Sequence, residues 1–438
     1  MKPRLRHLAA RLPLPASARV IAANAGSLVG TTAVTSALGA LFWALAARTF
    51  SPASVGLASV AVSSMTLLSM IGALGFGTLL MGRLSTERDD AGPLVATALT
   101  VTATASALLG GVFALLVGSV SSNLAPLSDG PIPLALFTIG TGLAGASLVL
   151  DQSLLGLLRG GLQLGRNTVF AVAKLLLLIG CALALSHVAG MTIYAAWVLG
   201  SALSLLVLLA YTLPRIGRLG ALRPRWALVR GLGRSALGHH TFNLALQAPS
   251  LVLPLVVATV LSIQSNASFY IAWMIAAFLM VVPISLCTTL FAVAGSDRGA
   301  LAEKVRFTLS ICVGLGLAAN VAMLPLAEPI LRVFGERYVE AAGALRILCL
   351  GLFPLTVQDH FVAICRIDGR VARVAPVIWA ISAAEVGAAA FGAARGGLTG
   401  LALGYVAVLL GGALLMLPTV IRGAGLGREQ ARAVRVRA

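Results

Sequence analysis

Two charged residues inside long apolar stretches are the first candidates for chemistry in this sequence. Asp151 and Lys174 lie in the fourth and fifth of twelve apolar segments, at equal distances from the centre of the expected connection. An antiparallel helical hairpin would bring the two positions to the same depth. A charge at the bilayer centre costs about 2.5–3.5 kcal/mol on insertion scales, so it should face protein or water. We predict a buried Asp151–Lys174 ion pair, which either locks two helices together or places Lys174 as a cationic contact in a translocation cavity.

Asp359 and Glu385 are the matching acidic residues in the second half of the chain, where no lysine lies near them. A buried carboxylate without a neighbouring cation readily takes up a proton or binds Na⁺. We therefore predict that these two residues carry a coupling ion. The alternative is that they are neutralised by pairing with His360 or Arg366.

Four arginines lie at the ends of apolar segments, namely Arg48, Arg83, Arg159 and Arg366. The guanidinium group matches the geometry of phosphate oxygens, so these residues and Lys174 are candidate contacts for an anionic substrate. Snorkelling of a long side chain towards the membrane surface explains their positions equally well. The transport hypothesis requires the buried ionic side chains to meet in one aqueous cavity between two lobes.

The elements that must position these residues are membrane-spanning helices. Of the 438 residues, 59% are hydrophobic and 11% are charged, and the mean hydropathy is +0.98. Soluble proteins carry about 25% charged residues, so this chain cannot cover a globular surface with charge. The composition excludes a cytosolic enzyme, a secreted disulfide scaffold and a disordered tail protein. It predicts an all-α polytopic membrane protein.

Polar interruptions divide the chain into about twelve transmembrane helices, each long enough for the roughly 20 apolar residues that a span requires. The predicted spans cover residues 20–47, 55–81, 93–118, 133–157, 168–187, 191–213, 236–262, 267–293, 307–326, 343–365, 374–393 and 398–421.

Basic residues set the predicted orientation. With the N-terminus in the cytoplasm, 26 of the 32 Lys and Arg residues fall in inside segments and four fall in outside loops. The positive-inside rule therefore places both termini in the cytoplasm. The expected organisation is a cytoplasmic tail (1–19), a six-helix lobe (20–213), a basic linker (214–235), a second six-helix lobe (236–421) and a cytoplasmic tail (422–438).

The two predicted lobes resemble repeats of one another. Asp151 is followed by Arg159 and then by Gly165-Arg166, while Asp359 is followed by Arg366 and then by Gly369-Arg370. Both lobes have the same predicted orientation. The pattern indicates a parallel, pseudo-symmetric repeat, and transporters built in this way bind their substrate where the repeats meet.

Several familiar motifs point away from enzymatic or cofactor chemistry. Residues 140–145 match GxGxxG, but they lie inside an apolar span rather than at a strand-to-helix turn, which predicts a close-packing surface. No P-loop, catalytic carboxylate pair or nucleophile–base set stands out, and the five cysteines have no ligand-type spacing. The sequence predicts no enzyme activity, no cofactor, no metal site and no nucleic-acid partner.

Two local patterns carry a family resemblance. Ala47-Arg-Thr-Phe-Ser-Pro-Ala-Ser-Val-Gly56, with Gly72-Ala-Leu-Gly75 downstream, resembles the first two spans of polysaccharide-export flippases, although Val55 stands where the family has an aromatic residue. Residues 333–348, Val-Phe-Gly-Glu-Arg-Tyr-Val-Glu-Ala-Ala-Gly-Ala-Leu-Arg-Ile-Leu, resemble the loop before span ten in that family.

The resemblance implies membership of the multidrug/oligosaccharidyl-lipid/polysaccharide exporter (MOP) superfamily. Flippases of this superfamily move undecaprenyl-pyrophosphate-linked sugars to the outer leaflet by alternating access of two lobes around a cationic cavity, driven by an ion gradient or the membrane potential. We therefore expect a lipid-linked oligosaccharide flippase of a bacterial cytoplasmic membrane. Its expected partners are the lipid bilayer, the lipid-linked substrate and a polysaccharide polymerase or glycosyltransferases.

Two alternatives stay open. An ion-coupled multidrug or metabolite antiporter of the same superfamily would need acidic, aromatic cavity walls to bind organic cations. A non-transporting scaffold for glycan-assembly enzymes would tolerate replacement of every charge within the spans.

Overall fold

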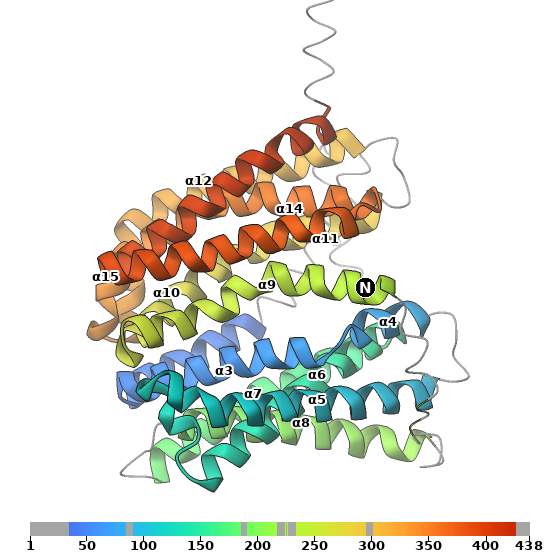
Figure 1. The fold of residues 1–438 in the computed structure, drawn as a ribbon, viewed down its shortest axis with the longest axis vertical. Helices are drawn as coiled ribbons and strands as arrows, with labels where there is room; N and C mark the ends of the chain where they lie inside the picture. Colours follow the sequence, from blue (N-terminus) through green and yellow to red (C-terminus); the bar gives the residue numbers. More distant parts are fainter. Residues whose placement is uncertain are drawn as a thin grey trace, which may run out of the picture. The chain divides into compact units, whose positions relative to one another are not determined.

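The structure is a computed structural model that describes residues 35–84, 91–184, 191–216, 224, 226, 234–294 and 301–425. The predicted N-terminal tail, the start of the first span, most of the basic linker and the end of the C-terminal tail lie outside these residues. The described residues form helices and short connections without a β-strand (Figure 1). The predicted all-α polytopic fold is confirmed.

Contacts divide the chain into two compact units, which are called here the N-terminal unit (Leu38–Tyr270) and the C-terminal unit (Ile271–Ala438 with Met1–Ala37). The N-terminal unit contains residues 38–49 of a helix over residues 35–49 and the elements α3 (Pro52–Gly72), α4 (Phe76–Arg83), α5 (Ala91–Val120), η1 (Ser122–Leu127), α6 (Pro131–Gly156), α7 (Gly160–Ala184), α8 (Thr192–Ile216) and α9 (Arg234–Val260). Helix α10 (Ile263–Leu279) begins in it. The C-terminal unit contains the end of α10 and the elements α11 (Val281–Ala294), α12 (Leu301–Phe334), η4 (Glu336–Ala341), α13 (Ala342–Leu350), α14 (Leu352–Ile367) and α15 (Val371–Gly423).

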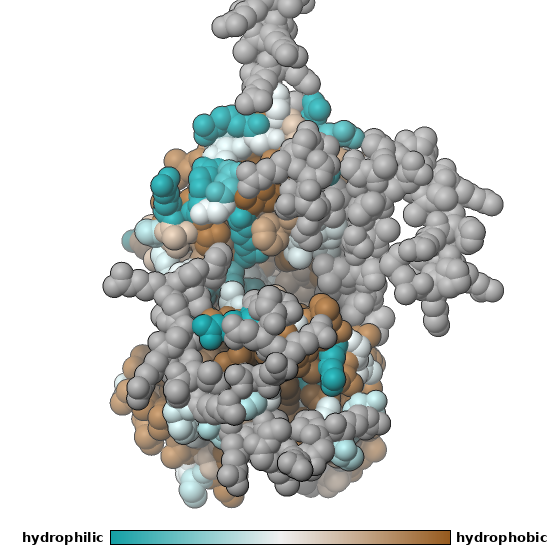
Figure 2. Space-filling model, turned by 90° about the vertical axis from the view of Figure 1, so that its right-hand side faces the viewer, coloured by the Kyte–Doolittle hydropathy of each residue, from teal (hydrophilic) through white to brown (hydrophobic). Residues whose placement is uncertain are grey.

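Most long helices overlap the predicted spans, although α7 begins eight residues before its predicted span and α12 extends beyond both ends of its own. Among the described residues, nine helices are long and apolar enough to cross a membrane, or ten if the bent pair α10 and α11 forms one span. Helix α15 covers two predicted spans. Gly396 and Gly397 have non-helical backbone angles and divide it into two helical parts. Large apolar side chains such as Leu183 are exposed, and Figure 2 shows apolar patches, in brown, beside hydrophilic ones, in teal. Such a surface suits contact with lipid.

Three spans contain breaks that the hydropathy pattern does not predict. The second span divides into α3 and α4 at Leu74 and Gly75, which both have positive φ. The eighth span bends by 44° between α10 and α11, and the tenth divides at Gly351. A break in the middle of an apolar run leaves the average hydropathy unchanged, so the pattern carries no signal for it.

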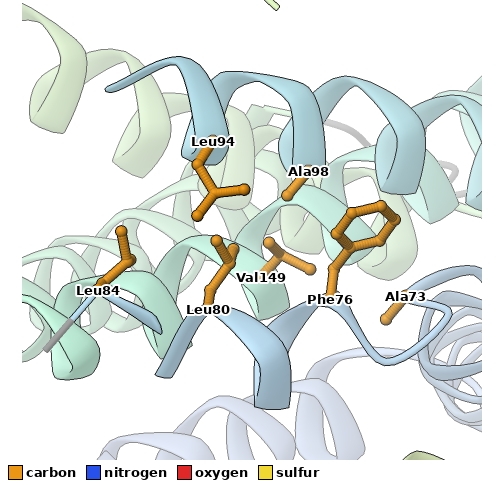
Figure 3. Close-up of a cluster of buried hydrophobic side chains, with 7 residues drawn as sticks. All are labelled: Ala73, Phe76, Leu80, Leu84, Leu94, Ala98 and Val149. Atoms are coloured by element: carbon orange, nitrogen blue, oxygen red, sulfur yellow. The ribbon is translucent and has the colours of Figure 1, made fainter. Parts of the chain in front are cut away.

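The short helix α4 is held in place by a core of its own. Phe76, Leu80 and Leu84 lie one helical turn apart and pack against Leu94 of α5 and Val149 of α6, as Figure 3 shows. All five side chains are nearly fully buried. The break after α3 therefore orients α4 so that its apolar face points towards the interior of the N-terminal unit.

Helix α9 packs with the N-terminal unit, although the sequence predicts it as the first span of the second lobe. It contacts α3 and α4, and the Asn123 side chain of η1 donates a hydrogen bond of 2.9 Å to the Ala258 carbonyl of α9. The contact boundary consequently falls within α10 rather than in the linker 214–235.

The turns after α6 and α14 have the same backbone structure. Leu158 (φ 58°) and Gly369 (φ 67°) adopt left-handed conformations. The next residues, Arg159 and Arg370, each donate a backbone hydrogen bond to the carbonyl five residues earlier. This is the Schellman ending of a helix. The repeated turn therefore pairs Arg159 with Arg370, which corrects the predicted correspondence of Arg159 with Arg366.

The Schellman turn predicts a stabilising substitution. Leu158 is 78% exposed and occupies a conformation that disfavours residues with a Cβ atom by about 1–2 kcal/mol. We expect Leu158→Gly to raise the thermal unfolding temperature of the detergent-purified protein. Gly369→Leu is the matched control and should lower it. A neutral result for both variants would contradict this account of the turn.

Candidate functional site

Asp151 pairs with Arg166, not with Lys174. The Arg166 Nε donates to Asp151 Oδ1 at 2.8 Å, and Nη2 donates to Oδ2 at 2.6 Å. This is the fork-to-fork geometry of a strong arginine–carboxylate pair. The predicted Asp151–Lys174 ion pair is therefore wrong.

The short connection between α6 and α7 explains the error. The sequence predicts a loop of about ten residues, whereas α6 ends at Gly156 and α7 begins at Gly160. The centre of the hairpin is therefore Leu158, and Asp151 reaches the depth of residues 165 and 166. Lys174 instead lies about 21 Å along α7 from its first residue, at 1.5 Å per residue.

The Asp151–Arg166 pair extends into a polar network between three helices. Arg166 Nη2 also donates to the Asn167 side chain at 2.8 Å, and Nη1 lies 3.4 Å from the Ser204 hydroxyl of α8. The Arg166 side chain is only 4% exposed. Its charge is thus satisfied inside the N-terminal unit, and the network holds α6, α7 and α8 together at one end.

Lys174 ends in a box of three aromatic rings. Its Nζ lies 3.6 Å from the ring centroid of Trp197 on α8, 4.7 Å from Phe170 one turn earlier on α7, and 5.0 Å from Phe42 on the helix over residues 35–49. The residue is 4% exposed. No carboxylate of the described residues forms an ion pair with it. Cation–π attraction therefore replaces the predicted salt bridge.

Neighbouring residues fix the walls of this box. Trp43 makes an edge contact with Phe42, and Tyr270 lies 4.7 Å from the Trp43 ring. Gly200 of α8 packs directly against the backbone of Lys174. A Cβ atom at position 200 would lie only 2.9 Å from the backbone nitrogen of Lys174. The missing side chain lets α8 approach α7 closely enough for Trp197 to cover the ammonium group.

Asp359 of α14, which is half-buried, and Glu385 of α15, which is buried, are acids in the interior of the C-terminal unit. Among the described residues, neither Asp359 Oδ2 nor Glu385 Oε1 has a hydrogen-bond partner, although both atoms are shielded from solvent. Buried carboxylate oxygens usually accept hydrogen bonds. These two atoms therefore lack the hydrogen bonds that offset the burial of a carboxylate, and the prediction that they hold a coupling ion stays a prediction.

The same region contains an arginine and an aromatic pair. Arg366 is close enough to Asp359 for its charge to act on the carboxylate. Asp359 and Glu385 are also close enough to Tyr405 for their charges to act electrostatically on its phenol group. The Tyr405 ring contacts Trp273 at a centroid distance of 5.2 Å. The sequence singles out the acids and Arg366 but not Tyr405, because helical spacing alone does not connect Tyr405 to them.

His360 does not pair with Asp359. Its Nδ1 lies 2.8 Å from the Thr356 carbonyl and its Nε2 lies 3.0 Å from the Thr308 hydroxyl. The ring also contacts Cys287. This alternative for neutralising Asp359 is therefore wrong, and Arg366 is the predicted partner that does act on it.

The other candidate arginines of the N-terminal unit lie at its two ends. Arg83 ends α4, and Arg159 follows α6 at the same end, because Gly156 packs directly against Leu80 and Met81. Arg48 lies near the opposite end of α3, whose 21 residues span about 30 Å. The structure does not gather these arginines around Lys174. It places the cations at three levels along the unit.

The glycine motif in α6 is a packing surface, as predicted. A Cβ atom at Gly140 would collide with Tyr194 of α8, and one at Gly142 would crowd the Ala103 carbonyl of α5. Gly145 likewise lies against Ser106 of α5. The residues that match GxGxxG thus allow close helix contact.

The fold is similar to that of MATE transporters. An inward-facing multidrug resistance MATE transporter of the MOP superfamily aligns over 92% of this chain and 95% of its own, with a TM-score of 0.68 and 16% identity. An outward-facing conformation of such a transporter aligns over 99% of both chains, with a TM-score of 0.64 and 16% identity.

A third similar structure is a MOP superfamily transporter from Pyrococcus furiosus for which a reverse polarity of the binding pocket suggests a different function. It aligns over 96% of this chain and 97% of its own, with a TM-score of 0.62 and 15% identity. No family model and no curated protein matches the sequence. At these identities the comparisons establish the MATE-type fold.

The Asp151–Arg166 geometry predicts a large stability effect. Asp151→Asn should leave the Arg166 charge buried without its partner, at a cost of about 3–5 kcal/mol. We expect a marked fall in the thermal unfolding temperature in detergent. The double variant Asp151→Leu/Arg166→Met should recover most of the loss, since it removes both charges.

Asp368→Asn is the matched control, because the Asp368–Arg370 pair is more than one-third exposed on both sides and such pairs contribute little. Equal effects of Asp151→Asn and Asp368→Asn would contradict a structural role for the buried pair.

Proposed function

We propose that this protein is an alternating-access transporter of a bacterial cytoplasmic membrane that flips an undecaprenyl-pyrophosphate-linked oligosaccharide. The MATE-type fold is the observation that carries the transport proposal, because related conformations of this fold face opposite sides of the membrane. A pyrophosphate head with attached sugars cannot cross hydrocarbon unaided. The transporter must therefore give the head group a polar path while the lipid tail stays in the bilayer.

The cations of the N-terminal unit support an anionic substrate. In the N-terminal unit, Arg166 neutralises Asp151, while Lys174 remains a cation without a carboxylate partner among the described residues. Arg83 and Arg159 lie at one end of that unit and Arg48 at the other. Cations at three levels can receive an anionic head group in successive steps. Lys174 can take part only after its ammonium group leaves the aromatic box.

The C-terminal unit supplies the proposed coupling site. Asp359 and Glu385 each hold one buried carboxylate oxygen without a hydrogen-bond partner in the described structure. Uptake of H⁺ or Na⁺ would cancel a charge that is costly in a membrane interior. Arg366 would then modulate ion affinity at Asp359 as well as meet an anion. A polymerase or glycosyltransferases are the proposed protein partners.

Export in a deletion strain tests the flippase proposal. We expect Lys174→Ala to abolish surface-glycan export and to cause lipid-linked intermediates to accumulate, while the variant reaches the membrane at normal levels. Arg332→Ala is the matched control, because Arg332 is exposed and forms an ion pair with the exposed Glu336. Normal export by Lys174→Ala would remove Lys174 from the substrate path. Normal export by every intramembrane charge variant would favour a scaffold.

An ion-coupled antiporter of organic cations is the second candidate function. The observation in its favour is that Asp359 and Glu385 each have a shielded carboxylate oxygen and lie near Tyr405, whose ring contacts Trp273, since acids and aromatic rings are what such a substrate requires. We expect Asp359→Asn and Glu385→Gln to abolish ion-driven transport in proteoliposomes under either function. Glu336→Gln, at an exposed glutamate, should have no effect.

The transported substrate separates the two functions. Uptake of a fluorescent organic cation, with drug sensitivity of the deletion strain, would identify the antiporter. Movement of the lipid-linked oligosaccharide with unchanged drug sensitivity would identify the flippase.

A further inference from the structure

The aromatic box of the N-terminal unit, formed by Phe42, Phe170 and Trp197, has the chemistry of a cation-binding site. Three ring faces surround one ammonium group at 3.6 to 5.0 Å. Aromatic rings attract cations through the negative potential of their faces, and cages of this kind recognise compact quaternary ammonium ligands. The group they hold here is part of the same chain.

The box is assembled from separate helices rather than from a single local motif. Phe42 comes from the helix over residues 35–49, Phe170 from α7 and Trp197 from α8. Phe42 and Phe170 each contact the Trp197 ring edge-on, at centroid distances of 5.5 and 5.4 Å. The rings therefore support one another, and the box does not depend on Lys174 for all of its contacts.

The cation–π contacts that Lys174 makes with the box are contacts that a free ammonium ligand could also make. Its ammonium group makes cation–π contacts and no ion pair with the described carboxylates, so the rings provide no direction-specific hydrogen bond that only a lysine could use. Trp197 and Phe170 are themselves only partly buried. Phe42 and Lys174 are buried, so the position between the three rings is free for another cation only when the lysine side chain leaves it.

We propose that the aromatic box is a binding site for a compact organic ammonium ion and that Lys174 is an internal ligand that occupies it in this conformation. Two cations inside the same box would repel one another, so the box holds either the Lys174 ammonium group or the external ion. Binding of the ion consequently releases the Lys174 ammonium group. This inference holds whichever substrate the transporter moves.

Ligand binding to the purified full-length protein tests the site, with tetramethylammonium chloride as the probe. Intrinsic tryptophan fluorescence and thermal unfolding are measured at constant ionic strength, with sodium chloride as the balancing salt. We expect Lys174→Ala to bind tetramethylammonium at least tenfold more tightly than the wild type, because the competing internal cation is gone. tert-Butanol, a neutral molecule of similar shape, should give no saturable change.

Two double variants locate the signal. Lys174→Ala/Trp197→Leu removes the closest ring and should lose at least tenfold in affinity relative to Lys174→Ala. Lys174→Ala/Trp379→Leu is the matched control, because Trp379 lies on α15 outside the box, and it should bind as tightly as Lys174→Ala. If Lys174→Ala does not fold, Lys174→Val serves instead, since valine fills the base of the box and leaves the ammonium position open.

Three results would overturn the proposal. They are no binding by a folded Lys174 variant, equal affinity in wild type and variant, and affinity that does not depend on Trp197. None of them bears on glycan export, so the two proposals fail independently.

Discussion

The free-energy cost of an ionic side chain in hydrocarbon is the constraint on which the interior of this protein depends. The structure meets that cost in three different ways. Asp151 and Arg166 cancel one another through two short hydrogen bonds. Lys174 exchanges water for aromatic faces. Asp359 and Glu385 keep buried oxygens without hydrogen-bond partners in the described structure, which is the most costly solution and therefore the one that most needs a functional reason.

Close helix packing makes the second of these solutions possible. Gly200 allows α8 to lie against the backbone of Lys174, so the Trp197 ring reaches the ammonium group. In α6, the glycines at 140, 142 and 145 bring α5 and α8 similarly close. Small residues in membrane helices are usually explained by association of the helices themselves. Here one of them also shapes the surroundings of a charge.

The sequence predicts the fold well because spans depend on average hydropathy, which is a property of about 20 residues at a time. It fails where a single residue changes the geometry. The turn at Leu158 shortens one connection, shifts the register of the hairpin and gives Asp151 a different partner. The breaks at Leu74, Met280 and Gly351 lie inside apolar runs and are invisible to the same average.

In the candidate site, the sequence reveals which residues matter but not which residues they contact. Lys174, Asp359 and Glu385 were predicted as important because charges in apolar segments are rare, and each is buried or nearly so. Their partners were not predictable. Phe42, Trp197 and Tyr405 resemble any other apolar or aromatic residue of a span, and only the folded chain brings them to a charge.

The repeated turn separates what the two halves share from what each has acquired. The backbone hydrogen bonds after α6 and α14 are the same, yet the ionic groups around them differ. In the first half the arginine of the network lies within α7 and binds an acid across the hairpin. In the second half Arg370 binds Asp368 within the turn itself, which leaves Asp359 to Arg366 on the same helix. A backbone turn can be inherited without its charges because it depends on φ and ψ alone. The ionic groups can then diverge, so that one half holds a caged cation while the other holds two acids.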